Sequence, residues 1–249
     1  DVYKRQAMNL AMEVQQNLLP AEMPIVKGLD IAGHSIYCDE TGGDLYDFLE
    51  LCCRDSDQIG IAVGDVSGHG ISAALLMATV RAFLRARVTK PGNLSEIISD
   101  VNRLVAHDTS ETSQFMTLFY AEINPSERSV SWIRAGHDPA ITYIPDSDTF
   151  DELKGPGMAL GIDDNYVFHS QKLTGLKKDQ ILLIGTDGLW ETKSESGEMF
   201  GKERLKGLIR QRAHLSSQEM IDEIVDALRA FQQSVKQEDD ITLAVIKIN

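Results

Sequence analysis

The sequence predicts an α+β fold, in which helices cover the outer faces of antiparallel sheet. Short β-type runs are grouped along the chain, and the helical segments stand apart from them in pairs. This order differs from the regular alternation of strand and helix that is typical of a parallel sheet. The chain has 249 residues, of which 43% are hydrophobic, so it can bury a full core.

The N-terminal segment is predicted to be an amphipathic helix. Its apolar residues recur at steps of four, three and four, and they are Ala7, Ala11, Val14 and Leu18. This spacing is that of one helix face, and Pro20 ends it. Because the chain begins with Asp1, we expect residues 1–20 to be a linker or coiled-coil helix from an absent upstream region. Residues 21–249 are expected to form one domain.

From Gly28 onward the hydrophobic pattern changes to short β-type runs, joined by Gly- and Asp-rich turns. The expected strands are residues 29–37, 44–51, 59–66, 115–123, 129–135, 140–144, 166–173, 180–184 and 241–248. The expected helices are residues 71–88, 94–107, 202–212 and 217–235. The breaker Pro91-Gly92 separates the first two helices.

Charge and hydropathy exclude two classes of partner. The chain carries 24 Lys and Arg residues against 38 Asp and Glu residues, a formal charge of −14. Nucleic acid is not an expected partner, because affinity for its backbone comes mainly from clustered Lys and Arg. The longest apolar stretches, such as residues 71–80, are shorter than the roughly 18 residues that cross a bilayer. We therefore expect no membrane contact within this fragment and a cytoplasmic location.

The three cysteines are Cys38, Cys52 and Cys53. They are odd in number and lack the paired spacing of a zinc site or a disulfide framework. We expect reduced thiols in the core or in strands, in a reducing compartment.

Four acidic motifs stand next to expected strands. Three are Asp-Gly clusters, in residues 42–44, 64–70 and 185–188, and the fourth is the pair Asp239-Asp240 before the last strand. Carboxylates that leave buried strands at turns can converge on one site, where like charges raise one another's pKa and cost stability. A single motif of this kind is more often an Asx-type turn, but four in one chain favour a site.

A group of carboxylates suits Mg²⁺ or Mn²⁺, which prefer oxygen ligands. The cations would remove the repulsion between the carboxylates. Two such ions about 4 Å apart can bind a phosphoryl group and lower the pKa of a bridging water. The glycines let the backbone approach the ions and the phosphate without a Cβ in the way.

Six ordered motifs resemble those of bacterial PPM-type phosphatases, which are similar to protein phosphatase 2C, and within these the SpoIIE/RsbU branch. The motifs are residues 14–20 (VQQNLLP), 42–47 (GGDLYD), 64–70 (GDVSGHG), 135–139 (AGHDP), 186–191 (TDGLWE) and 239–242 (DDIT). The resemblance runs from about Met12 to the C-terminus. It implies a four-layer αββα sandwich of two antiparallel sheets flanked by helices, with two Mn²⁺ or Mg²⁺ ions at one edge.

The resemblance also implies a set of ligands. Asp65 would bridge both ions, the Val66 carbonyl and a water-linked Asp44 would serve one ion, and Asp187 and Asp239 would serve the other. Asp240 falls where many relatives have Asn and is the second choice at that position. The catalytic candidates are Asp65, Asp187 and His69. Water is the implied nucleophile, without a covalent phosphoenzyme.

Other residues near the motifs have open roles. His69 lies four residues after Asp65 and could protonate the leaving seryl oxygen, the alternative being a structural turn histidine. His137 matches a motif but is expected to be structural, not a metal ligand. Ser67 lacks the Gly-x-Ser-x-Gly elbow of a covalent hydrolase. Arg134 cannot be assigned to the substrate phosphate.

The resemblance implies a metal-dependent protein serine/threonine phosphatase acting on a regulatory partner. By resemblance, that partner is a phosphorylated anti-anti-sigma (STAS-type) protein in a partner-switching pathway, and the N-terminal helix could pair two chains in a homodimer. One alternative is a catalytically silent binding module of the same fold, although the retained Asp residues argue against it. Another is a two-metal phosphoesterase for small molecules, and the sequence has no Walker motif to support nucleotides.

Overall fold

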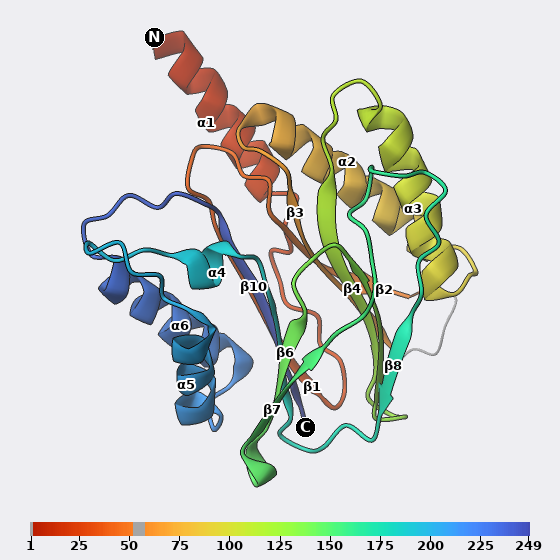
Figure 1. Cartoon of the computed structure of the whole chain (residues 1–249), viewed down its shortest axis with the longest axis vertical. Coiled ribbons are helices and arrows are strands. Elements are labelled where there is room, and N and C mark those ends of the chain that lie inside the picture. Colours follow the sequence, from red (N-terminus) through yellow and green to blue (C-terminus); the bar gives the residue numbers. More distant parts are fainter. Residues whose placement is uncertain (1, 52–57) are drawn as a thin grey trace.

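The computed structural model describes residues 2–51 and 58–249, and they form two five-stranded antiparallel sheets packed face to face (Figure 1). The first sheet has the order β1 (Leu29–Ile36), β10 (Ile241–Ile248), β9 (Ile181–Gly185), β6 (Ala140–Ile144) and β7 (Thr149–Leu153). The second has the order β2 (Leu45–Glu50), β3 (Ile59–Val66), β4 (Met116–Asn124), β5 (Ser129–Ala135) and β8 (Gln171–Thr174). Cys52 and Cys53 lie outside the described residues.

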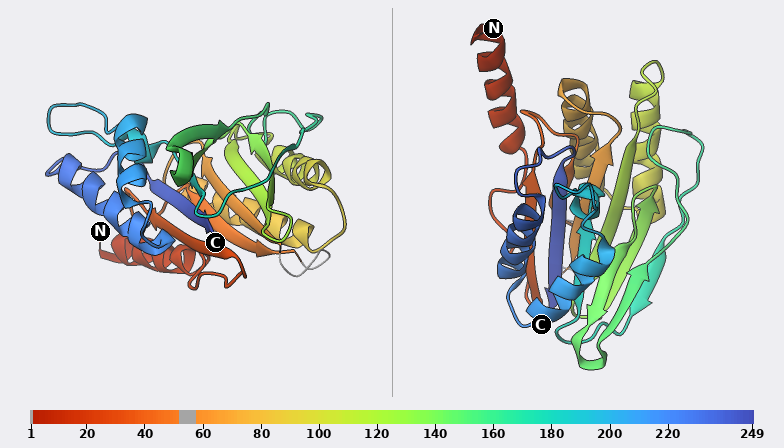
Figure 2. Two further views of the ribbon diagram at one scale, coloured as in Figure 1. Left: turned by 90° about the horizontal axis from the view of Figure 1, so that it is seen from below. Right: turned by 60° about the vertical axis from the view of Figure 1, so that its left-hand side comes forward.

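Helices cover the outer faces of both sheets (Figure 2). The second sheet is covered by α2 (Ile71–Val88) and α3 (Leu94–Thr109), and the first by α5 (Lys202–Arg212) and α6 (Ser217–Gln232). The short helices are η1 (Pro145–Ser147) and α4 (Gly188–Glu191), and α1 (Val2–Gln16) projects from the body. The predicted α+β fold, with four αββα layers, is confirmed. None of the described helices is long and apolar enough to span a membrane.

Three apolar cores hold the layers together. The middle core fills the space between the two sheets, with Phe119 from the second sheet and Ile184 from the first among its buried members. An outer core packs α2 and α3 on the second sheet, and it includes Met77 with no exposed surface. The other outer core packs α5 and α6 on the first sheet. Trp190 belongs to this core, with 8% of its surface exposed.

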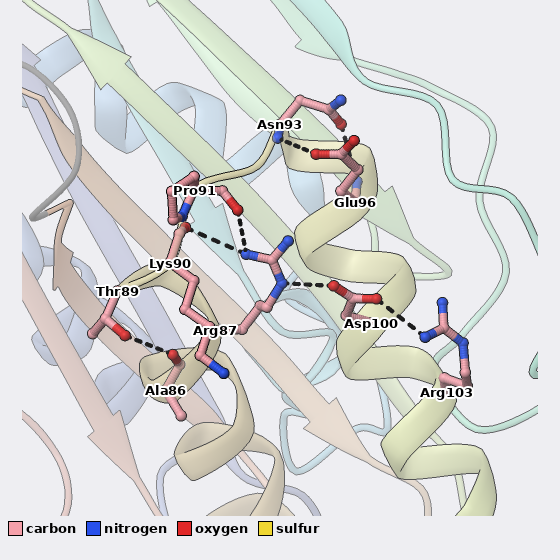
Figure 3. Close-up of polar contacts among 9 residues, drawn as sticks. All are labelled: Ala86, Arg87, Thr89, Lys90, Pro91, Asn93, Glu96, Asp100 and Arg103. Atoms are coloured by element: carbon pink, nitrogen blue, oxygen red, sulfur yellow. Dashed lines mark hydrogen bonds and ion pairs between the residues drawn. The ribbon is translucent and has the colours of Figure 1, made fainter.

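The turn between α2 and α3 is fixed by polar contacts (Figure 3). Arg87 donates from Nε to Asp100 at 2.7 Å and from Nη1 to the Pro91 carbonyl at 3.1 Å. Asn93 caps α3, because its side chain accepts from the amide of Glu96 while the Glu96 carboxylate accepts from the amide of Asn93. This reciprocal cap satisfies two amides that the helix cannot pair itself. It explains why α3 begins directly after the predicted Pro91-Gly92 break.

The structure corrects two expectations about strands. The expected strand 166–173 is reduced to β8, because Tyr166 and Phe168 instead pack from a loop against the core under α2 and α3. Asn102 on α3 bonds this loop, donating to the Asp163 carbonyl and accepting from the amide of Gly161. The strand β7 was not expected, since only two of its five residues are apolar and it lies at a sheet edge beyond an Asp-rich turn.

Candidate metal centre

The acidic motifs meet at one end of the two sheets. Asp65 is the penultimate residue of β3 and Asp44 directly precedes β2, in the second sheet. Asp187 follows β9 and Asp239 lies just before β10, in the first sheet. Because these neighbouring strands are antiparallel, the end of β3 lies beside the start of β2, and the end of β9 beside the start of β10. Each sheet therefore presents two carboxylates at the same edge.

The carboxylates repel one another. Burial, followed by repulsion from Asp187, Asp239 and Asp240, raises the pKa of Asp65 from 3.8 to about 7. Burial and then the charge of Asp239 raise the pKa of Asp187. Burial is also the main cause that raises the pKa of Asp239. Such a group of like charges is costly unless a cation lies among them.

Asp44 is the most deeply buried member of this group, with 1% of its surface exposed. Burial, then repulsion from Asp65 and Asp240, raise its pKa well above the ordinary value. Its Oδ2 accepts a hydrogen bond of 2.8 Å from the hydroxyl of Thr186. Because Thr186 directly precedes Asp187, this bond links the ligand candidates of the two sheets.

Asp239 and Asp240 have different surroundings. Asp240 accepts from the amide of Cys38 at 2.8 Å through one oxygen and from the amide of Gly43 at 2.9 Å through the other. Asp239 is exposed, and its Oδ1 accepts from the amide of Asp240 at 2.8 Å. Asp240 therefore holds the segment before β2, whereas Asp239 has one oxygen without a hydrogen bond to the described residues.

Glycines keep the segments of the centre close together. A Cβ added to Gly43 would lie 3.1 Å from the carbonyl oxygen of Val66, and one added to Gly42 would collide with the carboxylate of Asp240. A Cβ on Gly188 would collide with the Asp240 carbonyl. The Asp-Gly pattern in the sequence thus marks positions where the backbone approaches other groups of the centre.

The donor set suits a hard divalent cation. All candidate ligand atoms are oxygens. The carboxylates repel one another, and a bound cation would neutralise their negative charge. In the described part of the chain, no three His, Cys, Asp or Glu side chains are already arranged so that they could hold an ion. The fit therefore rests on oxygen chemistry and on mutual repulsion, not on a finished coordination shell.

His69 lies at the rim of the centre. Its side chain is 86% exposed, and Nδ1 lies 3.9 Å from Oδ2 of Asp39. It follows Gly68, whose φ of 89° gives the turn after β3 a conformation that glycine adopts readily. The exposed ring is accessible to a molecule that approaches the centre from solvent.

A cavity of about 280 Å³ opens between the two sheets at this edge. It is lined by Asp65, Thr117, Gly136, His137, Asp138, Asp187 and Glu191. His137 is buried, and burial lowers its pKa to about 4, so its ring is neutral near pH 7. Arg134 donates to the carbonyl of Gly155 at 3.0 Å and does not line the cavity.

Sequence reasoning missed three polar residues that hold the centre. Thr186 was inside a recognised motif, but only its contact with Asp44 shows its role. Thr117 has no motif, and only the strand register places it opposite Asp65. Gln15 is 5% exposed, and its carboxamide makes two hydrogen bonds with the Gly42 backbone, of 2.6 and 3.1 Å. Its neighbours in the sequence gave no signal that this one Gln is buried.

The fold and the acidic edge define the PP2C-like class of phosphatase domains. The family described as Stage II sporulation protein E (SpoIIE) matches residues 55–249. The chain belongs to this SpoIIE family. The match begins after Asp44.

Three known proteins show how far the similarity extends. Phosphoserine phosphatase RsbU of Bacillus subtilis is 32% identical over 240 residues, which cover 96% of this chain and 69% of RsbU. Protein IcfG of Synechocystis is 29% identical and aligns with all of this chain, which spans 42% of IcfG. The SiaA-PP2C domain of Pseudomonas aeruginosa has a TM-score of 0.83 at 21% identity, covering 99% of this chain and 98% of that domain. At this identity the third comparison supports the fold alone.

Proposed function

We propose that this chain is a metal-dependent protein serine/threonine phosphatase. The observation that carries the proposal is the convergence of carboxylates from both sheets around one cavity, in a chain of the SpoIIE family. The similarity to phosphoserine phosphatase RsbU supports the same reaction. The proposed ligands of two Mn²⁺ or Mg²⁺ ions are Asp44, Asp65, Val66 through its carbonyl, Asp187 and Asp239. Asp240 is a weaker candidate, because both of its oxygens accept backbone amides.

The proposal assigns a role in hydrolysis to Asp65, Asp187 and His69. The ions, when bound, would supply a Lewis acid for the phosphoryl group and lower the pKa of a bound water. Asp65 and Asp187 approach from opposite sheets, and their negatively charged carboxylates would bind the cations. Hydrolysis forms a bond between a water oxygen and phosphorus and breaks the bond to the seryl oxygen, which must leave with a proton. We assign that proton to His69 at the exposed rim.

The proposed substrate is phosphoserine or phosphothreonine on a regulatory protein. The resemblance to the RsbU branch supports a phosphorylated anti-anti-sigma (STAS-type) protein, and a cytoplasmic location belongs to the same proposal. The chain's net charge of −14 does not favour a nucleic-acid substrate. The exposed edge of the centre is accessible to a side chain presented by a folded partner, because His69 and its turn lie at the surface.

The test compares hydrolysis of p-nitrophenyl phosphate and of a panel of phosphoproteins with Mn²⁺, with Mg²⁺ and with chelator. Activity should require the metal, and Asp187→Asn should reduce turnover at least about a hundredfold at saturating metal, the scale of a lost electrostatic contribution. Asp226→Asn on α6 is the control, since its side chain is 79% exposed and does not line the cavity. Activity that resists chelation would contradict the mechanism. Phosphoprotein binding without hydrolysis would favour the silent binding module.

We also propose that α1 connects the centre to an upstream region and pairs with a second chain. Leu10 and Val14 on α1 are 61% and 57% exposed, which leaves an apolar strip beside the buried Gln15. An isolated helix of this length is marginal in water, so a partner helix would stabilise it. The contact of Gln15 with Gly42 supports a connection to the segment that carries Asp44.

A further inference from the structure

His137 stands between the two sheets at the edge that carries the acidic centre. It lies in the connection between β5 and β6, and 3% of its surface is exposed. Gly136 before it has a φ of 72°, and a Cβ there would lie 2.8 Å from the amide nitrogen of Ala159. The backbone directly before His137 is therefore closely packed, and its conformation favours glycine at position 136.

Each ring nitrogen of His137 has a hydrogen-bond partner in a different sheet. Nε2 lies 3.1 Å from the carbonyl oxygen of Gly185 at the end of β9. Nδ1 lies 2.9 Å from the hydroxyl oxygen of Thr117 on β4. A carbonyl oxygen can only accept, so Nε2 carries the proton and donates. In the neutral ring Nδ1 then accepts, and the hydroxyl of Thr117 donates to it.

The two partners of the ring stand next to the two carboxylates that face each other across the cavity. Thr117 is registered directly opposite Asp65 in the pairing of β3 with β4. Gly185 precedes Asp187 by two residues and ends the strand that carries it into the centre. The imidazole thus bridges β4, which pairs with the strand of Asp65, and β9, which ends two residues before Asp187.

We propose that His137 is a positioning residue that sets the spacing between Asp65 and Asp187 through a hydrogen-bonded relay from Thr117 to the Gly185 carbonyl. This inference rests on the proposed metal-dependent function. Without the relay, the repulsion between the carboxylates would drive the two sheet edges apart, and the affinity for divalent cations would fall.

The geometry separates this role from others that a histidine near a metal centre could have. Both ring nitrogens are engaged with chain atoms, so neither is available as a ligand or as a proton donor to substrate. A general role in holding the sheets together can be tested separately, because another partly buried hydrogen bond joins the sheets elsewhere. Trp132 on β5 donates from Nε1 to the Lys154 carbonyl after β7, at 2.9 Å, and neither residue lines the cavity.

The experiment measures Mn²⁺ binding by calorimetry and the Mn²⁺ concentration for half-maximal phosphatase activity in the full 249-residue chain. His137→Leu removes both hydrogen bonds and should weaken Mn²⁺ binding at least about tenfold. His137→Gln retains a donor that can reach the Gly185 carbonyl, and His137→Asn retains an acceptor for Thr117. Each should give an intermediate loss.

Two further comparisons keep the test independent of the stability of the histidine variants. Thr117→Val removes the hydroxyl at nearly constant shape and should weaken Mn²⁺ binding about threefold or more, the scale of one hydrogen bond, whereas Thr117→Ser should restore it. Trp132→Phe removes one bond between the sheets away from the centre. It should lower the melting temperature in chelator without changing the Mn²⁺ affinity.

Wild-type Mn²⁺ affinity in folded His137→Leu would overturn the inference, as would equal affinities in Thr117→Val and Thr117→Ser. An equal loss of affinity in Trp132→Phe would show that any contact between the sheets has this effect, and would also overturn it. Failure of the proposed function is a different result, because then the wild-type chain itself would show no Mn²⁺-dependent hydrolysis.

Discussion

Asp65→Asn is expected to stabilise the protein in the absence of divalent cations while it abolishes activity. In the folded chain the pKa of Asp65 is raised from 3.8 to about 7, by burial first and then by three neighbouring carboxylates. Between these two pH values the folded state binds more protons than the unfolded state. The contribution of Asp65 to stability is therefore present at low pH and is lost as pH rises through about 7.

The size of the effect follows from the shift. Each pKa unit corresponds to about 1.4 kcal/mol, so the full shift sets an upper limit of about 4 kcal/mol. Because Asp65 is partly exposed at the cavity, solvent screening reduces this to the order of 2 kcal/mol. For a chain of this length, that corresponds to an increase in melting temperature of about 4–8 °C for the Asn variant at pH 8.

The assay is thermal unfolding in chelator at pH 5 and pH 8, repeated at pH 8 with Mn²⁺. The advantage of Asp65→Asn should be smaller at pH 5, because more of the wild-type carboxyl is protonated there in the folded state. Mn²⁺ should raise the melting temperature of the wild type but not that of the variant. Asp100→Asn is the control of opposite sign, because a hydrogen bond from Arg87 lowers the pKa of Asp100. That variant should be less stable than wild type at pH 8.

The reasoning would be refuted if Asp65→Asn melted at or below the wild-type temperature in chelator at pH 8. It would equally be refuted if the difference between the two proteins were the same at both pH values. Either result would mean that the carboxylates do not share a repulsive centre in the folded chain.

Three further outcomes can be measured. His69→Ala should slow hydrolysis of a phosphoserine protein at least about tenfold and of p-nitrophenyl phosphate much less, because only the seryl leaving group needs a proton; equal losses would indicate a structural turn. Gln15→Leu should raise the Mn²⁺ concentration for half-maximal activity, through the lost Gly42 contacts, whereas Gln16→Leu at an exposed position should not. Asn93→Ala should lower the melting temperature by about 2–4 °C, the scale of a lost N-cap, without changing metal activation.

Most of the fold follows from local patterns in the sequence. After Gly28, the expected bounds of strands and helices agree with the structure to within three residues, apart from residues 166–173. That exception arose because Tyr166 and Phe168 alternate as in a strand, while their burial comes from packing of a loop under α3. A periodic pattern indicates which side chains are buried, but the partner that buries them is a tertiary property.

The acidic motifs predicted that carboxylates gather at one place, but not the contacts that hold them there. Asp44, Asp65 and Asp187 were singled out because Gly-rich turns place them at strand ends, and Asp239 because it stands in an acidic pair before the last strand. Their partners lie far away along the chain, as with Thr186, which bonds Asp44 across 142 positions. Such contacts depend on how two sheets are registered and packed, and no local pattern of the sequence contains that information.

These long-range hydrogen bonds explain how the folded chain can keep mutually repelling carboxylates at one end of the sheets. Asp44 and Asp65 belong to one sheet, and Asp187 and Asp239 to the other, so part of their repulsion acts between the two sheets at this end of the sandwich. Neutral hydrogen bonds cross or brace that end, with the Thr186 hydroxyl on Asp44 and the His137 imidazole between the sheets. Burial of apolar side chains in the middle core stabilises the fold against the repulsion among these carboxylates. In the proposed function, a bound cation would neutralise this repulsion, so the metal-free protein is expected to be less stable than the metal-bound one.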